Sequence, residues 1–427
     1  MSSVLAHARR LLRRNDSLLW HTVIMLAASS GGGLLNYVYQ ILMGRMLGPD
    51  EYGVLCALLS ILYIVSVPAQ TLQVTATRTT AFLVEQGGRD SIGLAVRRMT
   101  KWAGLLALVG LGLSLVCSRG LAGFLRTKSV TPAIMLGIAA SCQLLVPPFN
   151  GALQGCQWFG RLAIAQIGGF VAKLLVAAGL VILGLGVNGA IAGIALGSMC
   201  TLGLALWFLR DVVARHGTAQ ELPATPVYSV LAFLTVGLLT LLYNTDVILA
   251  KRFLTAEQAG QYSAATTLAK ALFFAAAASG GVLFPKLSQD RRGATDIRNR
   301  AMLKSTLAIA IIMSGAGALI LNLFGRFLVT SMFGSQYGEA GGIVGLCAVT
   351  FALFTAVYVL AYYHLALARR GVLAILTTGL ALQVIGIAMA HGSARGIVLV
   401  VLGSMAAESA MMLVYTAWPR GNRGIEA

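Results

Sequence analysis

The sequence is short of charge, and above all of negative charge. Only 11% of its 427 residues are Asp, Glu, Lys or Arg, and only 14 residues are acidic. A soluble globular chain carries roughly 25% charged residues. A chain so poor in charge and 58% hydrophobic cannot cover a surface that faces water. The composition therefore excludes a soluble enzyme and makes a lipid bilayer the expected solvent.

Motifs for catalysis and metal binding are also missing. The six cysteines occur singly in or beside apolar runs without C-x-x-C spacing, which predicts packing residues and not disulfides or metal ligands. The five histidines are scattered, and no H-E-x-x-H, P-loop or G-x-S-x-G motif is found. We therefore predict no catalytic residues, no metal site and no cofactor. An ATP-driven pump is disfavoured on the same grounds.

What the sequence does have is a series of apolar stretches, each about 20 residues long and thus sufficient to cross the hydrocarbon core as a helix. The stretches are continuous and lack the period-2 alternation of barrel strands. We predict an all-α polytopic membrane protein with about 12 transmembrane helices. The expected spans are 18–44, 52–78, 101–118, 131–153, 162–184, 188–209, 227–250, 262–284, 302–324, 341–366, 371–390 and 396–418.

The distribution of basic residues predicts the orientation of these spans. If the N-terminus is cytoplasmic, most of the 32 Lys and Arg residues fall in cytoplasmic segments, as the positive-inside bias requires. Both termini are then cytoplasmic, and residues 1–17 form a basic amphipathic segment on the cytoplasmic face. The net charge of +18 thus reports topology. Membrane lipids are the expected surroundings, and nucleic acid is not an expected partner.

An internal repeat divides the chain into halves. Residues 45–53 have a counterpart in residues 252–260, and the Leu-Gly-Ser-Met of residues 196–199 recurs at nearly the same displacement in residues 402–405. We predict two six-helix bundles, with a linker and a tail in the cytoplasm. Because six is even, the bundles share one orientation and are related by a pseudo-two-fold axis along the membrane normal. The bundles are residues 18–210 and 226–418, the linker is 211–225, and the tail is 419–427.

Charged side chains inside the spans are candidates for function, because each costs roughly 2.5 to 3.5 kcal/mol to insert. Lys173, Lys270 and Glu408 are expected near the midplane; Lys173, for example, lies about 18 Å along its helix from Arg161. We predict that both lysines contact substrate, with a buried ion pair to Glu408 as the alternative. Arg78 is expected near the cytoplasmic boundary, where it either snorkels or faces a cavity.

Two acidic residues are candidates for ion coupling. Glu408 is the better one for binding H⁺ or Na⁺, because low dielectric favours the protonated form of a carboxylate. Asp246 lies near the outer end of its span, and either couples an ion or pairs with Lys251 or Arg252. Basic residues outnumber acidic ones within the spans, a balance that suits a phosphate or pyrophosphate more than a cationic drug.

Glycines near the middle of the first span, Gly31, Gly32 and Gly33, are the predicted hinge. Close helix packing is the alternative and the more common use of small residues in membrane helices.

The hairpin at residues 42–53 carries a family resemblance. Its R-x-L-G-P-x-E-Y-G core is similar to the first hairpin of Wzx-type polysaccharide flippases, of the O-antigen and exopolysaccharide kind, in the multidrug/oligosaccharidyl-lipid/polysaccharide exporter superfamily. Residues 246–249, 260–264 and 333–337 match as well. The resemblance implies alternating access that carries an undecaprenyl-pyrophosphate-linked oligosaccharide to the outer leaflet of the bacterial inner membrane.

The same resemblance implies a cationic lumen. Arg78, Lys173 and Lys270 are then the candidates for binding the substrate, with Arg45 and Arg252 on the gate side. Coupling to H⁺ or Na⁺ is expected, and a glycan polymerase or glycosyltransferases are the expected protein partners.

Three other interpretations stay open. A lipid II flippase has a similar fold but usually two more helices. A multidrug and toxin exporter shares the architecture, yet would use acidic residues in the first half, whose spans hold no deep Asp or Glu. A membrane-bound polysaccharide polymerase or ligase would need a large outer loop, and the outer loops here are short.

Overall fold

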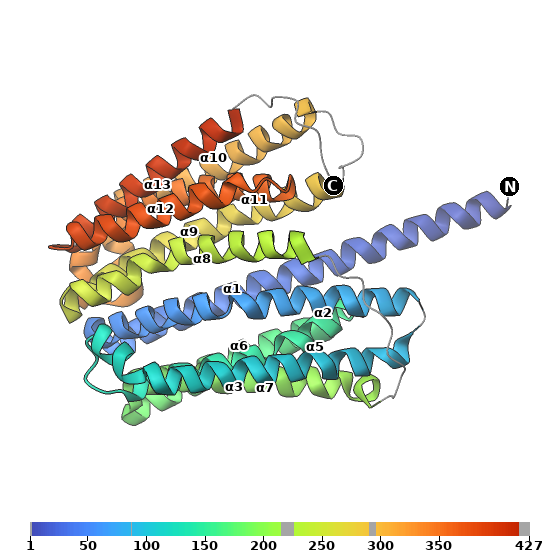
Figure 1. Ribbon diagram of the computed structural model, residues 1–427, viewed down its shortest axis with the longest axis horizontal. Helices are drawn as coiled ribbons and strands as arrows, with labels where there is room; N and C mark the ends of the chain where they lie inside the picture. The colour runs from blue at the N-terminus through green and yellow to red at the C-terminus, as the bar shows by residue number, and fades with distance from the viewer. Residues whose placement is uncertain (1, 87, 215–225, 290–295, 418–427) are drawn as a thin grey trace. The chain divides into compact units, whose positions relative to one another are not determined.

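Helices joined by short turns make up the part of the chain that the computed structural model describes (Figure 1). The backbone is described for residues 2–86, 88–214, 226–289 and 296–417, and side chains for residues 31–86, 88, 90–214, 230–273 and 301–417. No strand occurs among these residues. The predicted all-α polytopic fold is confirmed, and each of the twelve expected spans falls on helix.

The first half of the chain holds seven α-helices within the described residues, because two of its six expected spans are each divided between two helices while α1 contains both the first span and the start of the second. Ser66 separates α1 from α2 within the expected span 52–78, and Leu145 and Val146 separate α4 from α5 within span 131–153. Proline follows both breaks, at Pro68 and at Pro147, and its missing N–H ends helices. The helices are α1 (Ser2–Val65), α2 (Val67–Glu85), α3 (Ile92–Phe124), α4 (Thr131–Leu144), α5 (Pro147–Gly155), α6 (Phe159–Leu180) and α7 (Gly186–Val213).

Two local features shape the helix ends in this half. α1 is interrupted at Gly48, whose φ of 72° and ψ of 173° are not helical, so that the predicted hairpin turn falls here. A positive φ is readily adopted only by glycine. A π-helical turn, Val181–Leu185, links α6 to α7 and contains Gly184 with φ 86°. A short 3₁₀ turn, Arg89–Ser91, precedes α3.

In its described residues, the second half holds six α-helices that coincide with its six expected spans. A 3₁₀ segment, Ser335–Gly342, comes between the third and fourth of them. The helices are α8 (Pro226–Phe253), α9 (Ala256–Gln289), α10 (Asp296–Phe333), α11 (Val344–Ala366), α12 (Gly371–Met389) and α13 (Ala394–Ala417).

The chain divides into two compact units whose boundaries are not those of the two halves. The predicted bundle boundaries stay a prediction, as does the amphipathic segment 1–17, whose side chains lie outside the described residues. Residues 215–225 of the linker and the whole tail also lie outside them. Unit 1 comprises Met1–Met46, Pro68–Gly123 and Thr127–Ala224; unit 2 comprises Leu47–Val67, Phe124–Arg126 and Thr225–Ala427.

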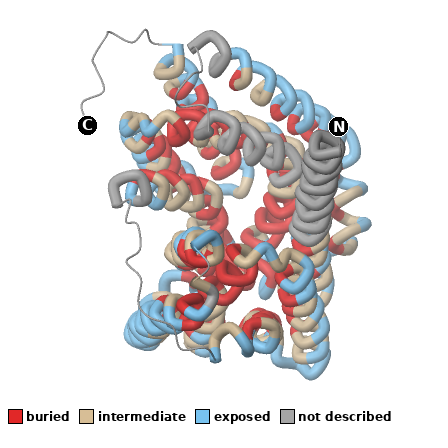
Figure 2. The backbone as a smooth tube through the Cα atoms, turned by 90° about the vertical axis from the view of Figure 1, so that its right-hand side faces the viewer, coloured by how far each residue is buried: buried red, intermediate tan, exposed pale blue. Residues whose placement is uncertain are grey.

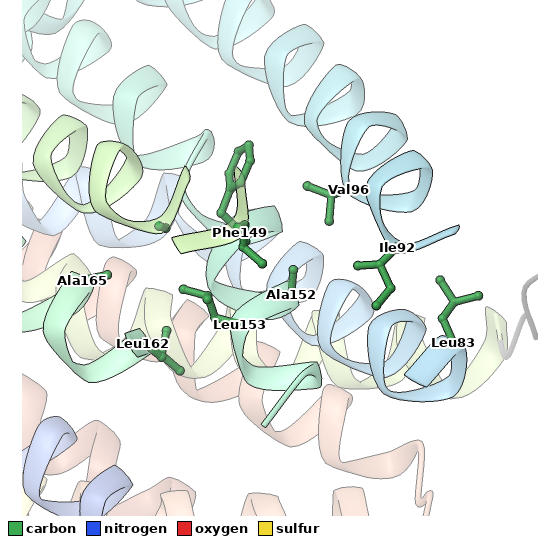
Figure 3. Close-up of a cluster of buried hydrophobic side chains, with 10 residues drawn as sticks. Leu83, Ile92, Val96, Phe149, Ala152, Leu153, Leu162 and Ala165 are labelled. Atoms are coloured by element: carbon green, nitrogen blue, oxygen red, sulfur yellow. The ribbon is translucent and has the colours of Figure 1, made fainter. Parts of the chain in front are cut away.

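Unit 1 is held together by small residues that let helices approach closely. α6 packs along α7, and α4 and α5 pack on α7 as well. A methyl group placed on Gly193 of α7 would lie only 2.5 Å from the Cβ of Ala177 on α6. A buried apolar cluster that includes Leu83, Ile92 and Phe149 fills the space among α2, α3 and α5 (Figure 3). Close packing of small residues is typical of membrane helices.

In unit 2 the helices α9, α10 and α11 pack on one another, and α13 packs against α11 and α12. Buried residues gather on the faces that the helices turn toward each other (Figure 2). α12 and α13 run antiparallel, because Gly371 lies against Tyr415 while Gly386 lies against Val400.

Nine stretches of the described residues are long and apolar enough to cross a bilayer, and one of them, Phe159–Val213, contains two of the expected spans. Their outward faces are apolar, as for Ile312 and Leu323 on α10, which are 69% and 68% exposed. Apolar side chains directed outward along helices of this length fit lipid surroundings. The architecture is that of a multi-pass membrane protein.

Candidate functional site

Lys173 of α6 is a buried cation in unit 1, with 9% of its surface exposed. Its Nζ donates a hydrogen bond of 2.6 Å to Oδ1 of Asn36 on α1. The same Nζ lies 4.0 Å from the centre of the Tyr39 ring. Among the described residues, no carboxylate lies within ion-pair distance of Lys173. A neutral amide and an aromatic face hold this ammonium without cancelling its charge.

The framework around Lys173 is fixed by packing. The hydroxyl of Tyr39 donates to the backbone carbonyl of Ala190 at 3.0 Å, which ties α1 to α7. A methyl group on Gly197 of α7 would lie 2.6 Å from the Cβ of Lys173, so α7 closely supports the stem of the lysine. The position of the ammonium is thus set by three helices of unit 1.

Lys270 of α9 has a different environment in unit 2. Its Nζ lies 3.7 Å from Oδ1 of Asp246 on α8, and the other carboxylate oxygen accepts a hydrogen bond of 3.0 Å from Tyr262. The Lys270 ammonium also lies 4.4 Å from the centre of the Tyr243 ring. Lys270 and Asp246 therefore form a buried ion pair. The suggested pairing of Asp246 with Lys251 or Arg252 is wrong, and so is that of Lys270 with Glu408.

Glu408 of α13 is completely buried, and both of its carboxylate oxygens lack a hydrogen-bond partner in the described part of the chain. The carboxylate lies against Gly379 of α12, where any Cβ would overlap its Oε2. Gln383, one turn further along α12, is also completely buried and has an Oε1 without a partner. The ion-coupling roles of Glu408 and Asp246 stay predictions.

Arg78 of α2 is exposed on unit 1. Two of the polar residues before it on α2, Gln73 and Thr77, contact Gln154 on α5, and Thr77 donates to its Oε1 at 3.3 Å. α5 approaches α2 through Gly151 and Gly155, where methyl groups would meet backbone oxygens of α2 at 2.6 and 2.7 Å. The polarity near Arg78 thus serves this contact, while the arginine itself is left accessible.

The two gate-side arginines lie in different units. Arg45 is exposed in unit 1, and Arg252 is half-buried in unit 2 with its guanidinium 5.5 Å from the centre of the Phe124 ring. Arg78 and Lys173 belong to unit 1, whereas Lys270 belongs to unit 2. The substrate-binding roles of all five basic residues stay predictions.

The glycines of the predicted hinge lie within continuous helix. A methyl group on Gly32 would lie 2.7 Å from the Phe170 ring, so this glycine admits an aromatic side chain of α6. Gly31 and Gly33 have open space beside them. The backbone of α1 departs from helical geometry at Gly48 instead. Hinge motion at residues 31–33 stays a prediction.

The two repeated hairpins meet inside unit 2. A methyl group on Gly53 would lie 2.9 Å from the backbone nitrogen of Gly260, and one on Gly260 would overlap the carbonyl of Pro49. Next to them, the hydroxyls of Tyr52 and Thr267 are hydrogen bonded at 3.2 Å. The first hairpin thus lies directly on α9, in contact with Gly260 and with Thr267, and Thr267 is one turn before Lys270.

Sequence reasoning missed the neutral residues that define these environments, namely Asn36, Tyr39 and Gln383. An Asn or Gln within an apolar run was a usable signal, because a buried amide must find partners. Tyr39 offered no such signal, since aromatic residues are common in membrane helices. The described residues contain no group of three or more His, Cys, Asp or Glu that could hold a metal ion.

Buried ionisable residues inside a bundle of membrane-spanning helices mark substrate and ion pathways. The fold agrees with this class. A multidrug resistance MATE family transporter of the MOP superfamily, in its inward-facing conformation, matches with a TM-score of 0.73 over 92% of this chain and 97% of that one, at 14% identity. The chain therefore has the fold of the MOP-superfamily transporters.

Other solved structures share this fold. A eukaryotic MATE transporter matches with a TM-score of 0.61 and 12% identity over 96% of both chains. A MOP superfamily transporter from Pyrococcus furiosus, reported to have a binding pocket of reverse polarity that suggests a different function, matches with a TM-score of 0.57 and 15% identity over 92% of this chain and 93% of its own.

The sequence itself identifies the family. A family model described as polysaccharide biosynthesis protein matches residues 42–341, from the first hairpin into the 3₁₀ segment before α11. The chain belongs to this family of polysaccharide biosynthesis proteins. No curated protein matches the sequence.

Proposed function

We propose that this protein is a flippase that moves an undecaprenyl-pyrophosphate-linked oligosaccharide from the cytoplasmic to the outer leaflet of the bacterial inner membrane by alternating access. Membership of the polysaccharide biosynthesis family supports a glycan-related substrate. The observation that carries the proposal is the buried ammonium of Lys173, which is cradled by neutral groups.

A buried ammonium without a counter-charge is costly, and the cost falls when an anion binds to it. Asn36 satisfies one of the three donors of Lys173, which leaves donors for phosphate oxygens. Charge-assisted hydrogen bonds to such an anion are roughly twice as strong as neutral ones. A pyrophosphate is the part of a lipid-linked sugar that carries this charge.

The other basic candidates divide into two groups. Lys270 is already neutralised by Asp246, which makes it a structural or coupling residue in this conformation. Arg78 is exposed in the same unit as Lys173 and is the second candidate for phosphate contact.

The reverse-polarity pocket reported for the Pyrococcus furiosus transporter shows that pocket charge varies within this fold. The cationic site at Lys173 favours an anionic substrate over a cationic drug.

Orientation and partners follow from the proposed substrate. Lipid-linked oligosaccharides are made on the cytoplasmic face, so the site must first open there, and both termini are proposed to be cytoplasmic. Glycosyltransferases that build the sugar and a polymerase that uses it outside are the expected neighbours.

The test uses a strain that lacks this gene but still makes the glycan precursor. Undecaprenyl-pyrophosphate oligosaccharide is extracted and quantified after complementation with wild type, Lys173→Gln or Lys101→Gln. Lys101 is the matched control because it is exposed on α3. We expect the precursor to build up without the gene, to fall with wild type and Lys101→Gln, and to stay high with Lys173→Gln.

Other outcomes would change the assignment. No build-up on deletion, combined with new sensitivity to cationic drugs, would favour a multidrug exporter. Build-up of the peptidoglycan precursor would favour a lipid II flippase. Full activity of Lys173→Gln would remove the observation on which the proposal rests.

A further inference from the structure

The carboxylate of Glu408 is an anomaly within unit 2. It is completely buried, and neither oxygen accepts a hydrogen bond within the part of the chain that the structure describes. An ionised carboxylate in such surroundings is strongly disfavoured unless something neutralises it. Buried polar atoms are otherwise nearly always hydrogen bonded, so an orphan of this kind calls for a ligand.

The packing around Glu408 leaves room for its carboxyl group only because a glycine lies opposite. Gly379 of α12 is opposite it, and any larger residue there would occupy the volume of Oε2. Gln383 lies four residues further along the same helix, about 6 Å away along the axis. Its Nε2 donates to the carbonyl of Leu242 on α8 at 3.3 Å, which leaves its buried Oε1 without a partner. Three orphaned oxygens thus belong to two side chains on facing helices.

No charged side chain within ion-pair distance neutralises Glu408 among the described residues. α12, which packs against α13, contains no ionisable residue. α13 also packs against α11, α8 and α9. On α8 and α9, Asp246 and Lys270 are paired with each other. On α11, His364 is hydrogen bonded to Thr416 at 2.9 Å, about 12 Å along α13 from Glu408. The remaining ionisable residues on these helices in the described part are Cys347, Tyr358, Tyr362 and Tyr363 on α11, Tyr243, Lys251 and Arg252 on α8, Glu257 and Tyr262 on α9, and Arg395 and Tyr415 on α13.

We propose that Glu408, packed against Gly379 of α12 and with Gln383 one turn further along that helix, is a proton-binding site that is loaded in this conformation and drives the flippase. The proton from water binds one carboxylate oxygen, so the side chain is a neutral carboxylic acid here. It becomes a carboxylate, and returns the proton to water, when a change of conformation hydrates the space between α12 and α13. The coupling role rests on the proposed function, whereas the protonated state does not.

The limited space at Glu408 and the small number of oxygen atoms available there indicate that a proton binds, and not a metal cation. A hard cation requires several oxygen ligands around it. At Glu408 the backbone of Gly379 lies directly against one carboxylate oxygen. Besides the two oxygens of Glu408, the only orphaned side-chain oxygen of α12 and α13 in the described part of the chain is that of Gln383, one turn away along α12. A proton needs neither a cavity nor a full set of ligands.

Infrared spectroscopy of the purified protein in lipid vesicles tests the site without reference to transport. A protonated carboxyl group has a C=O stretching band distinct from those of ionised carboxylates. We expect such a band at neutral pH in wild type, its loss in Glu408→Gln, and its retention in Asp246→Asn. In Gly379→Ala the band should shift or titrate at a different pH, because the added methyl group displaces the carboxyl.

A band that is unchanged in Glu408→Gln would overturn the proposal, and so would a band that appears only when Na⁺ is removed. The Gly379→Ala variant keeps the carboxyl and provides a second test should Glu408→Gln not fold. The two proposals fail separately. A Glu408 band in a protein whose loss causes no precursor build-up leaves the proton site intact and rejects the flippase. If wild type relieves the precursor build-up but the protein shows no Glu408 band, the proton site is rejected and the flippase assignment is left intact.

Discussion

The backbones of Gly53 and Gly260 lie in direct contact, although the two residues are in different halves of the sequence. A methyl group on Gly53 would be 2.9 Å from the nitrogen of Gly260. Both glycines occupy the last position of the repeated hairpin segment, so equivalent points of the repeat touch each other. The absence of a side chain at both positions allows the first hairpin to seat on α9.

Replacing one of these glycines should prevent that seating. In Gly260→Ala the new methyl group would overlap the carbonyl of Pro49, and overpacking of this kind costs roughly 1 to 3 kcal/mol. We expect a lower midpoint of thermal unfolding in detergent. Gly338→Ala is the control, because a methyl group there meets open space. Equal midpoints for the two variants would show that the hairpin contact does not contribute to stability.

The ion pair between Asp246 and Lys270 should be strongly coupled. Lys270→Met leaves Asp246 buried without its cation, which costs about 3 to 5 kcal/mol when a buried pair is broken. Asp246→Asn in the same chain should recover part of this loss. A double-mutant cycle on the unfolding free energy measures the coupling, with Lys304→Met on the exposed face of α10 as the control. Simple additivity of the two changes would contradict the pairing.

The sequence predicted the helical architecture well and the charge environments poorly. Apolar runs and basic loops follow directly from the thickness and electrostatics of a bilayer, so the spans and the hairpin at Gly48 were accessible. The pairing of Lys270 with Asp246 could not be predicted from the sequence, because it depends on which faces of α8 and α9 meet. The neutral cradle of Lys173 was likewise hidden, since it is made by residues of α1 far away in the sequence.

Tyr39 holds Lys173 by its ring and α7 by its hydroxyl, and two substitutions separate these roles. Tyr39→Phe removes the hydrogen bond to Ala190 and should cost about 0.5 to 1.5 kcal/mol of unfolding free energy while precursor clearance persists. Tyr39→Leu removes the ring as well, and with it a contact worth up to about 2 kcal/mol to a desolvated ammonium. Precursor assays and thermal unfolding measure the two effects. Identical behaviour of the variants would rule out a role for the ring.

The proposed orientation can be checked by labelling single cysteines in a background that lacks the native ones. Ser129 is exposed between α3 and α4, where the chain is expected outside, and Gln86 is exposed after α2, where it is expected inside. An impermeant maleimide added to intact spheroplasts should label Ser129→Cys alone, and Gln86→Cys should react only after lysis. The opposite pattern would invert the topology.

The neutral surroundings of the Lys173 ammonium have a consequence for the range of sugars that such a transporter accepts. An ammonium recognises phosphate oxygens, which are common to every polyprenyl-linked saccharide, and is indifferent to the sequence of sugars beyond them. On the proposed function, recognition at Lys173 therefore selects the lipid carrier, while the glycan is accommodated. Saccharides that differ in composition but share the same polyprenyl lipid should then compete for one transporter, and the order in which they cross would follow their abundance in the cytoplasmic leaflet.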